Sequence, residues 1–263
     1  MCNSYTITPE GELLVYVGRG VYLPVYRQMN LAIGPFDQGL FLKASDDEAR
    51  MVGVLGQWGM IRPGQDGRIE YKERPNKRPG GQPVKIPMLK NNARFETVSK
   101  SPAFRDAWKH GRRCLIPANT LREPNWETGR CVWWDLQRAD RLPWMVAGIW
   151  SEWTDPETGE VVPNYAMLTI NVDSHPLLNR LHKPEKDKAS GKPLPPEAQD
   201  KRGEAHIEPK DWDTWLHGTI EEATRLLVPA PPEMFNQTQA QQIDQQLKAI
   251  ESTMASIDQD DLF

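Results

Sequence analysis

Residues 144–150 read Trp-Met-Val-Ala-Gly-Ile-Trp, and residues 165–170 read Tyr-Ala-Met-Leu-Thr-Ile. Both runs are short and apolar, which predicts strands buried in a sheet. Residues 155–159, Asp-Pro-Glu-Thr-Gly, lie between the two runs and are typical of a turn. This strand–turn–strand pattern is the strongest indication of the fold class.

Further apolar runs lie on both sides of this pair. Most of them predict strands, within residues 13–17, 40–42, 52–55 and 131–134. Helical patterns are fewer, within residues 102–109, 209–216 and 219–226. Because strands outnumber helices and do not alternate strictly with them, the sequence predicts an α+β fold on a mixed or antiparallel sheet.

The chain has 263 residues, enough for one large domain with a core of its own. No stretch approaches 18 consecutive apolar residues, and the first residues have no basic and apolar leader pattern, so we expect neither a membrane span nor secretion. Cys2, Cys114 and Cys131 are odd in number and widely spaced. They argue against a disulfide framework and for a reducing cytoplasm, and we expect no metal or other cofactor.

Composition divides the chain. Residues 74–83 and 184–203 predict flexible loops, and we expect the domain to cover residues 2–228, followed by a Pro/Gln-rich acidic tail over residues 229–263. Apolar residues in the tail recur at helical spacing, which predicts a short amphipathic helix that docks or self-associates: Ile243, Leu247, Ile250, Met254 and Ile257.

The net charge of −4 hides a strong asymmetry. Residues 62–113 hold 14 Lys and Arg against 5 Asp and Glu, whereas the tail holds one Lys against 6 acids. The basic segment is suited to phosphates, although a solvated basic loop would have the same composition.

Cys2 follows the initiator methionine, which aminopeptidases remove when the next residue is small. A chain that starts at Cys2 has an amine with a pKa of about 7.7–8.0 and a thiol with a pKa of about 8.5 on adjacent carbons. Such a 1,2-aminothiol condenses with an aldehyde to a Schiff base and then closes a thiazolidine ring. Taken alone, Cys2 could also be an ordinary second residue.

Four other residues have side chains suited to this chemistry. Asn92 offers an amide and Arg94 a fork for phosphate. Glu123 follows a strand-like run that enters a turn and could be a general acid/base, although a surface glutamate is the simpler reading. His182 could move a proton, with His175 as the alternative, although a lone histidine is more often structural.

The order of these residues resembles the SRAP family, the SOS-response-associated peptidase-like proteins that process abasic sites in DNA. The resemblance spans residues 2–228, and its most specific marks are Cys2 and the run Asn-Ala-Arg-Phe-Glu-Thr at residues 92–97. The other matching segments are residues 57–63, 114–118 with Glu123, and 181–184.

The resemblance implies a compact, strand-rich, barrel-like domain with peripheral helices. It also implies that Cys2 forms a thiazolidine crosslink with an abasic site in single-stranded DNA, after self-processing that removes Met1. Asn92 would position the Cys2 end and the opened sugar, and Glu123 and His182 would handle protons. The DNA contacts would be Arg94, Trp58, Arg62 and Arg113.

This chain departs from the family pattern and represents a divergent branch. Asn3-Ser4 stand where the family has Gly-Arg, and residues 30–35 lack the family's proline in register. Residues 118–123 differ from the family's acidic and aromatic run, and Lys183-Pro184 and a long insert follow His182. DNA contacts around the four catalytic candidates are therefore expected to differ.

The last residues, Gln-Asp-Asp-Leu-Phe at 259–263, resemble a bacterial peptide that binds the replication sliding clamp. Gln259 would bind the rim of an apolar pocket that Leu262 and Phe263 fill. A solvated terminus is the simpler alternative.

The sequence favours a cytoplasmic, nucleoid-associated enzyme with lyase-like activity on abasic sites. Two alternatives are a cysteine peptidase that uses Cys2 on proteins, and a non-catalytic module that binds DNA or a sliding clamp.

Overall fold

The computed structural model describes residues 2–18, 21–24, 26, 31–45, 51–76, 78 and 80–260. For residues 251 and 253–260 it describes the backbone only.

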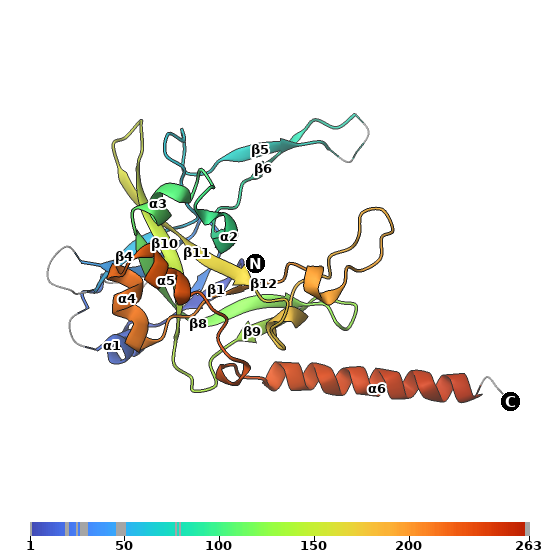
Figure 1. The fold of residues 1–263 in the computed structure, drawn as a ribbon. Helices are drawn as coiled ribbons and strands as arrows, with labels where there is room; N and C mark the ends of the chain where they lie inside the picture. Colours follow the sequence, from blue (N-terminus) through green and yellow to red (C-terminus); the bar gives the residue numbers. More distant parts are fainter. Residues whose placement is uncertain are drawn as a thin grey trace.

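Five strands close into a barrel in the order β10–β11–β4–β3–β8 and back to β10 (Figure 1). Their pairings are antiparallel except for β4 with β11, which is parallel, so the predicted mixed, strand-rich α+β fold is confirmed. The barrel strands are β3 (Gln38–Ala44), β4 (Met51–Trp58), β8 (Arg113–Asn125), β10 (Trp144–Thr154) and β11 (Val161–Asn171).

Further strands extend the barrel sheet and bring distant segments together. Strand β1 (Tyr5–Ile7) pairs with β8 and with β2 (Ala32–Ile33), and β9 (Val132–Leu136) pairs with the far end of β8. Strands β7 (Asn92–Arg94) and β12 (Arg202–Glu204) flank β11, because Thr169 pairs with Arg94 on one side and with Glu204 on the other. Residues near 2, 92, 123 and 204 are therefore neighbours.

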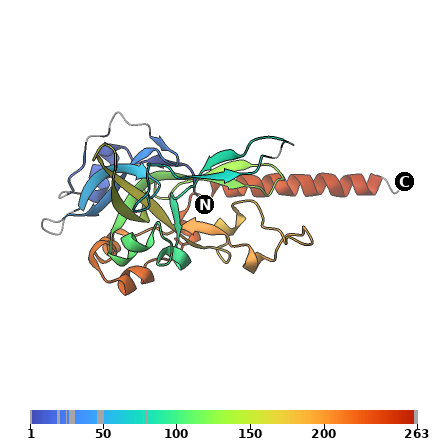
Figure 2. The same cartoon turned by 90° about the horizontal axis from the view of Figure 1, so that it is seen from above.

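Strands β5 (Tyr71–Arg74) and β6 (Val84–Pro87) form a separate antiparallel hairpin. This hairpin, which we call the basic arm, projects from the barrel in both views (Figures 1 and 2). The expected loop over residues 74–83 includes its tip, of which Lys77 and Pro79 lie outside the described residues.

The short helices cover the outside of the barrel. The patterns at 102–109, 209–216 and 219–226 correspond to α3 (Arg105–Lys109), α4 (Trp212–His217) and α5 (Ile220–Arg225). Helix α5 begins at a capping box in which the Thr219 hydroxyl accepts from the Glu222 amide. Helix α2 (Phe95–Val98) directly follows β7.

The strand predicted over residues 13–17 is wrong, because these residues belong to helix α1 (Glu10–Val17). Glu10 and Glu12 lie in its first turn, where negative charge stabilises a helix. Leu13 is its buried contact with the core, whereas Val15 is 86% exposed. The apolar run at residues 13–17 therefore belongs to a helix that buries only one narrow face.

The core continues past the expected boundary at residue 228. Phe235, Ala240 and Ile243 are buried in the same cluster as the barrel interior. The predicted helix falls within α6 (Thr238–Asp260), which is longer than expected. It docks by its first turns, where Ile243 is buried and Asp244 pairs with Arg180 at 2.6 Å, whereas Ile250 is exposed. The rest of α6 extends away from the barrel as a rod (Figures 1 and 2).

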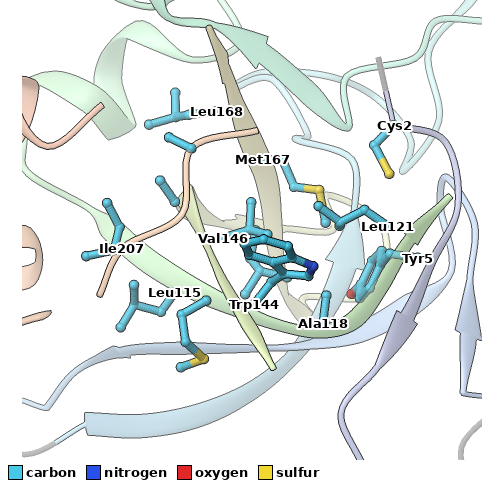
Figure 3. Close-up of a cluster of buried hydrophobic side chains, with 14 of the residues drawn as sticks. Cys2, Tyr5, Leu115, Ala118, Leu121, Trp144, Val146, Met167, Leu168 and Ile207 are labelled. Atoms are coloured by element: carbon cyan, nitrogen blue, oxygen red, sulfur yellow. The ribbon is translucent and has the colours of Figure 1, made fainter. Parts of the chain in front are cut away.

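The barrel interior is filled by aromatic and aliphatic side chains, with Trp144 and Val146 near the centre of the view in Figure 3. Cys2 lies at the margin of this cluster, beyond Leu121 and Met167 (Figure 3). None of the helices in the described part of the chain is long and apolar enough to cross a membrane.

Candidate active site

Cys2 lies at the end of the chain that leads into β1, directly beside strand β8. The Arg122 amide donates to Ser4 O at 3.0 Å, and Tyr5 pairs with Leu121, so the first residues run along the segment that bears Glu123. Cys2 is buried, and its thiol donates to Ser4 O at 3.1 Å. Strand pairing thus fixes the reactive end of the chain.

Two neighbouring asparagines hold the Cys2 carbonyl. Asn92 Nδ2 donates to Cys2 O at 2.6 Å, and Asn91 Nδ2 donates to the same oxygen at 3.1 Å. Both asparagines are positioned by β11, which binds the segment through the Met167 amide and Asn91 O at 2.9 Å. The structure therefore places Asn92 against Cys2, and it adds Asn91, which the sequence analysis missed.

Glu123 is 1% exposed and lies within β8. The expected turn before it is wrong, because β8 continues to Asn125 and pairs Glu123 with Trp134 of β9. In the described part of the chain, neither carboxylate oxygen of Glu123 has a hydrogen-bond partner. Burial raises the pKa of Glu123 well above its usual value, and nearby Glu204 raises it further. The protonated acid is therefore favoured.

His182 approaches the same carboxylate from the opposite segment. Its Nε2 lies 3.4 Å from Glu123 Oε2, and its amide donates to Pro124 O at 2.6 Å. His182 has a φ of 60°, a conformation that non-glycine residues adopt only when their surroundings impose it. The Asn125–Leu181 bridge supplies that restraint beside it.

The imidazole of His182 is neutral at physiological pH. Burial, followed by the positive charges of the amino terminus and Lys201, lowers its pKa to about 3. Lys201 Nζ is itself fixed, because it donates to the carbonyls of Leu181 and His182 at 2.6 and 2.8 Å. His182 can thus accept or relay a proton but does not carry a standing charge.

The thiol of Cys2 is also neutral. Its pKa lies well above the usual value because of burial, with further contributions from the charges of Glu123 and Glu204. A thiol in this state is a poor nucleophile until a partner removes its proton.

Glu204, a residue that the sequence analysis did not predict, completes the cluster. Its Oε1 accepts from the backbone N–H of Cys2 at 3.3 Å. Cys2 Sγ and one carboxylate oxygen each of Glu123 and Glu204 lie within 4.8 Å of one another. Glu204 directly follows the loop predicted over residues 184–203, and no motif marked it.

A cavity of about 280 Å³ lies beside His182. The β8–β9 turn and the insert line it, through Trp126, Arg180, Leu194 and Lys201 among others. Lys183 Nζ lies over the Trp126 ring, 5.1 Å from its centre. Trp126 gives the cavity an aromatic face of the kind on which a base stacks, whereas Arg180 in the lining is already paired with Glu127 and Asp244.

Two of the predicted DNA contacts are wrong. Trp58 is fully buried and packs edge-on against Tyr5 at 5.0 Å, so it offers no face to a base. Arg113 is 3% exposed and donates to the backbone carbonyls of Trp215 and Gly218, at the end of α4. Both side chains therefore contact segments that are distant in sequence and have a structural role. A local motif does not reveal such partners.

Arg94 and Arg62 are accessible. Arg94 is exposed and pairs with Asp200 of the insert at 2.7 Å, so phosphate would compete with this carboxylate. Arg62 is half-buried on the segment that follows β4. Their roles stay predictions.

His175, the alternative histidine, is a structural residue. Its Nδ1 accepts from the amides of Leu177 and Leu178, and its Nε2 contacts Ala230 O at 3.0 Å. Its hydrogen-bonding capacity is therefore occupied by backbone.

The clamp-like peptide falls largely outside the described residues. This applies to Leu262 and Phe263, whereas Gln259 lies in the backbone of α6.

Comparisons with known proteins identify the family and the fold of this chain. A family model described as SOS response associated peptidase (SRAP) matches residues 1–249. The abasic site processing protein YoqW of Bacillus subtilis is 25% identical over 200 residues, covering 69% of this chain and 73% of that protein. The abasic site processing protein YoaM of the same organism is 24% identical over 200 residues, covering 69% of this chain and 72% of that protein.

Solved structures share the fold. A crystal structure of a protein from Bordetella bronchiseptica has a TM-score of 0.69 and 26% identity, covering 89% of this chain and 97% of that chain. Another, from Bacteroides thetaiotaomicron, has a TM-score of 0.64 at 18% identity, covering 89% and 90% of the two chains, and supports the fold alone.

Proposed function

This chain belongs to the SOS response associated peptidase (SRAP) family, and we propose that it processes abasic sites in DNA. The names of YoqW and YoaM state that activity for those relatives. The finer proposal is that the chain binds single-stranded DNA and forms a thiazolidine crosslink through Cys2.

The contacts of Cys2 support this chemistry most directly. Its nitrogen faces Glu204, its carbonyl is held by Asn91 and Asn92, and two proton-transfer groups, Glu123 and His182, meet beside it. A structural second residue would need none of these buried polar groups. Met1 lies outside the described residues, and its removal would convert the Cys2 amide nitrogen to a primary amine.

The charge states set the order of steps. Because the pKa of the Cys2 thiol is raised, the amine attacks the aldehyde first and forms a Schiff base. Protonated Glu123 gives a proton to the departing oxygen, and neutral His182 relays protons with it. The thiol then adds to the imine carbon and closes the ring. The Schiff-base step releases one water, and the thiol addition releases none.

Asn92 fixes the reacting end of the chain, and Arg94 and Arg62 hold phosphate on the way to it. Arg94 would exchange Asp200 for a phosphate oxygen, since both are anions that a guanidinium binds as a fork. The cavity beside His182 would receive the nucleotide next to the opened sugar.

The test is a denaturing gel. The chain is incubated with a single-stranded oligonucleotide that contains one abasic site, beside Cys2→Ala and an exposed-cysteine control, Cys131→Ala. A slow band that needs Cys2 but not Cys131 supports the proposal. No band with retained DNA binding indicates a non-catalytic module, and Cys2-dependent cleavage of casein indicates a peptidase.

We further propose that the terminal peptide binds a sliding clamp and recruits the chain to replicating DNA in the nucleoid. Gln259, Leu262 and Phe263 would form the contact. Deleting residues 259–263 should abolish binding of the chain to a purified bacterial clamp, with crosslinking of free DNA unchanged. Equal clamp binding by the shortened chain would contradict this proposal.

A further inference from the structure

Glu204 is a second carboxylate at the reacting end of the chain. It ends β12, which β11 binds through the pairing of Thr169 with Glu204. The residue is 8% exposed, and its Oε1 accepts from Cys2 N at 3.3 Å. Glu123 therefore has a buried acidic neighbour across Cys2.

Two buried carboxylates at this separation do not both stay ionised without a cation. The neighbouring cationic side chains point elsewhere: Lys201 donates to the carbonyls of Leu181 and His182, and Arg202 pairs with Glu96 and Asp200. The amino terminus is the positive charge that lowers the pKa of both carboxyls. After Met1 is removed, that charge is centred on Cys2 N, the atom that faces Glu204.

The two carboxyls differ in their contacts. Glu123 is next to the Cys2 thiol and His182, whereas Glu204 contacts the nitrogen that must react. Burial raises the pKa of both, and that of Glu123 well above its usual value. A pair of carboxyls in unequal surroundings divides into an acid and a base.

We propose that Glu204 is a catalytic residue that binds the ammonium group of processed Cys2 and takes its proton. The proposal rests on the function proposed above and assigns the base of its first step. It leaves Glu123 and His182 to act at the sugar oxygen.

The step balances as follows. One proton moves from the Cys2 ammonium to the Glu204 carboxylate and leaves the lone pair on nitrogen. That pair forms the C–N bond with the aldehyde carbon, and the carbonyl oxygen takes a proton from Glu123. The nitrogen gives its second proton to the hydroxyl, which leaves as water and produces an iminium. The thiol sulfur then adds to the iminium carbon, and the thiol proton passes to the Glu123 carboxylate and restores the acid.

The test uses the full chain, produced as a fusion that a protease cleaves immediately before Cys2, so that every variant starts at Cys2. Glu204→Gln keeps the shape and removes the base. Glu197→Gln, which changes an exposed glutamate in the loop before β12, is the control. Crosslinking rates to abasic single-stranded DNA are measured by quenched time points. Binding is measured by fluorescence anisotropy with a closed tetrahydrofuran analogue, which cannot react.

General base catalysis contributes roughly 100-fold or more, so E204Q should crosslink at least tenfold more slowly than wild type, with unchanged affinity for the analogue. E197Q should match wild type. In Glu204→Ala, added formate should restore part of the rate, because a small carboxylate fills the vacated space, and it should not restore Cys2→Ala.

A rate for E204Q within about tenfold of wild type would overturn the role of Glu204 while the proposed function stands. A slow Glu204→Ala that formate fails to rescue would also overturn it, since a structural defect predicts that result. A wild-type chain that forms no crosslink would refute the proposed function itself, and with it this proposal.

Discussion

Glu123 has two carboxylate oxygens without hydrogen bonds, in a position where burial disfavours their charge. A free energy cost at such a site is typical of residues kept for chemistry. Because the pKa is raised on folding, the folded chain binds this proton more tightly than the unfolded chain. The resulting stability is fully present below the unfolded pKa of about 4.3 and is lost as pH rises through the folded pKa.

We therefore expect Glu123→Gln to gain stability relative to wild type as pH rises from 5 to 8. Thermal unfolding of both proteins at several pH values measures this. A difference in Tm that does not change with pH would contradict the raised pKa of Glu123.

The hydrogen bond from Asn92 Nδ2 is the shorter of the two that hold the Cys2 carbonyl. Asn92→Ala removes one donor, worth about 1 kcal/mol, and leaves Asn91 in place, so crosslinking should slow by about fivefold to tenfold. Asn171→Ala, an exposed amide on β11, is the matched control. An unchanged rate in Asn92→Ala would show that Asn91 alone positions Cys2.

Local sequence was sufficient for some residues and not for others. Asn92 and Glu123 were found because the family motif includes them, and their environment follows from β7 and β8. Trp58 and Arg113 were misassigned because their partners, Tyr5 and the end of α4, are distant in sequence. Glu204 was missed because its contact with Cys2 joins residues that are 202 positions apart in the sequence.

At the scale of elements, β8 does two tasks. Its first residue, Arg113, binds carbonyls at the carboxyl end of α4, where a cation is favourable, and its later part carries Glu123. Arg113→Met should lower stability by about 1.5–3 kcal/mol, since hydrogen bonds of a buried charge are lost. Affinity for single-stranded DNA should not change. If Arg113→Met bound DNA more weakly than wild type with an unchanged unfolding midpoint, Arg113 would be a DNA contact after all.

The basic arm has two unlike faces. Register places Lys72 opposite Ile86 and Arg74 opposite Val84, so one face has two cations beside aliphatic side chains. The other face pairs Glu73 with Lys85, which neutralises its charge. The first face is the one suited to a DNA backbone.

Lys72→Glu should therefore weaken binding to single-stranded DNA more than Lys85→Glu, although both change the net charge equally. Each lost phosphate contact lowers the slope of log affinity against log salt by about 0.7. Anisotropy titrations at several salt concentrations measure both effects. Equal effects of the two variants would mean that the arm contributes only its overall charge.

Strands were easier to predict than helices in this chain. The runs at 144–150 and 165–170 are central barrel strands, buried on both sides, so that apolar composition alone identified them. Helix α1 was misread because Leu14 and Val15 face outward, while Leu13 is buried and Tyr16 and Val17 only partly cover the core. The closure of the barrel through β8 and β10 has no local signature, because it depends on pairing between distant segments.

At the scale of the whole molecule, the barrel brings four distant parts of the chain to one point. Strand β1, which follows Cys2, pairs with β8, the strand that carries Glu123. Strand β11 binds both β7, which carries Asn92, and β12, which carries Glu204. The fold class could be predicted from the sequence, and the catalytic roles of Cys2, Asn92, Glu123 and His182 stay predictions. The position of Glu204 beside Cys2 and the extent of the core to Ile243 required the three-dimensional structure.

The central claim is that the amine and the thiol of Cys2 capture one aldehyde together. The most direct measurement is mass spectrometry of the amino-terminal peptide after the chain reacts with abasic single-stranded DNA and the DNA is digested. The account predicts a peptide that begins at Cys2 and carries the sugar remnant, with a mass lower by one water than the sum of the two. The Cys2 thiol in this peptide should not react with an alkylating reagent. A peptide that still begins with Met1, or an adduct on any other residue, would contradict it.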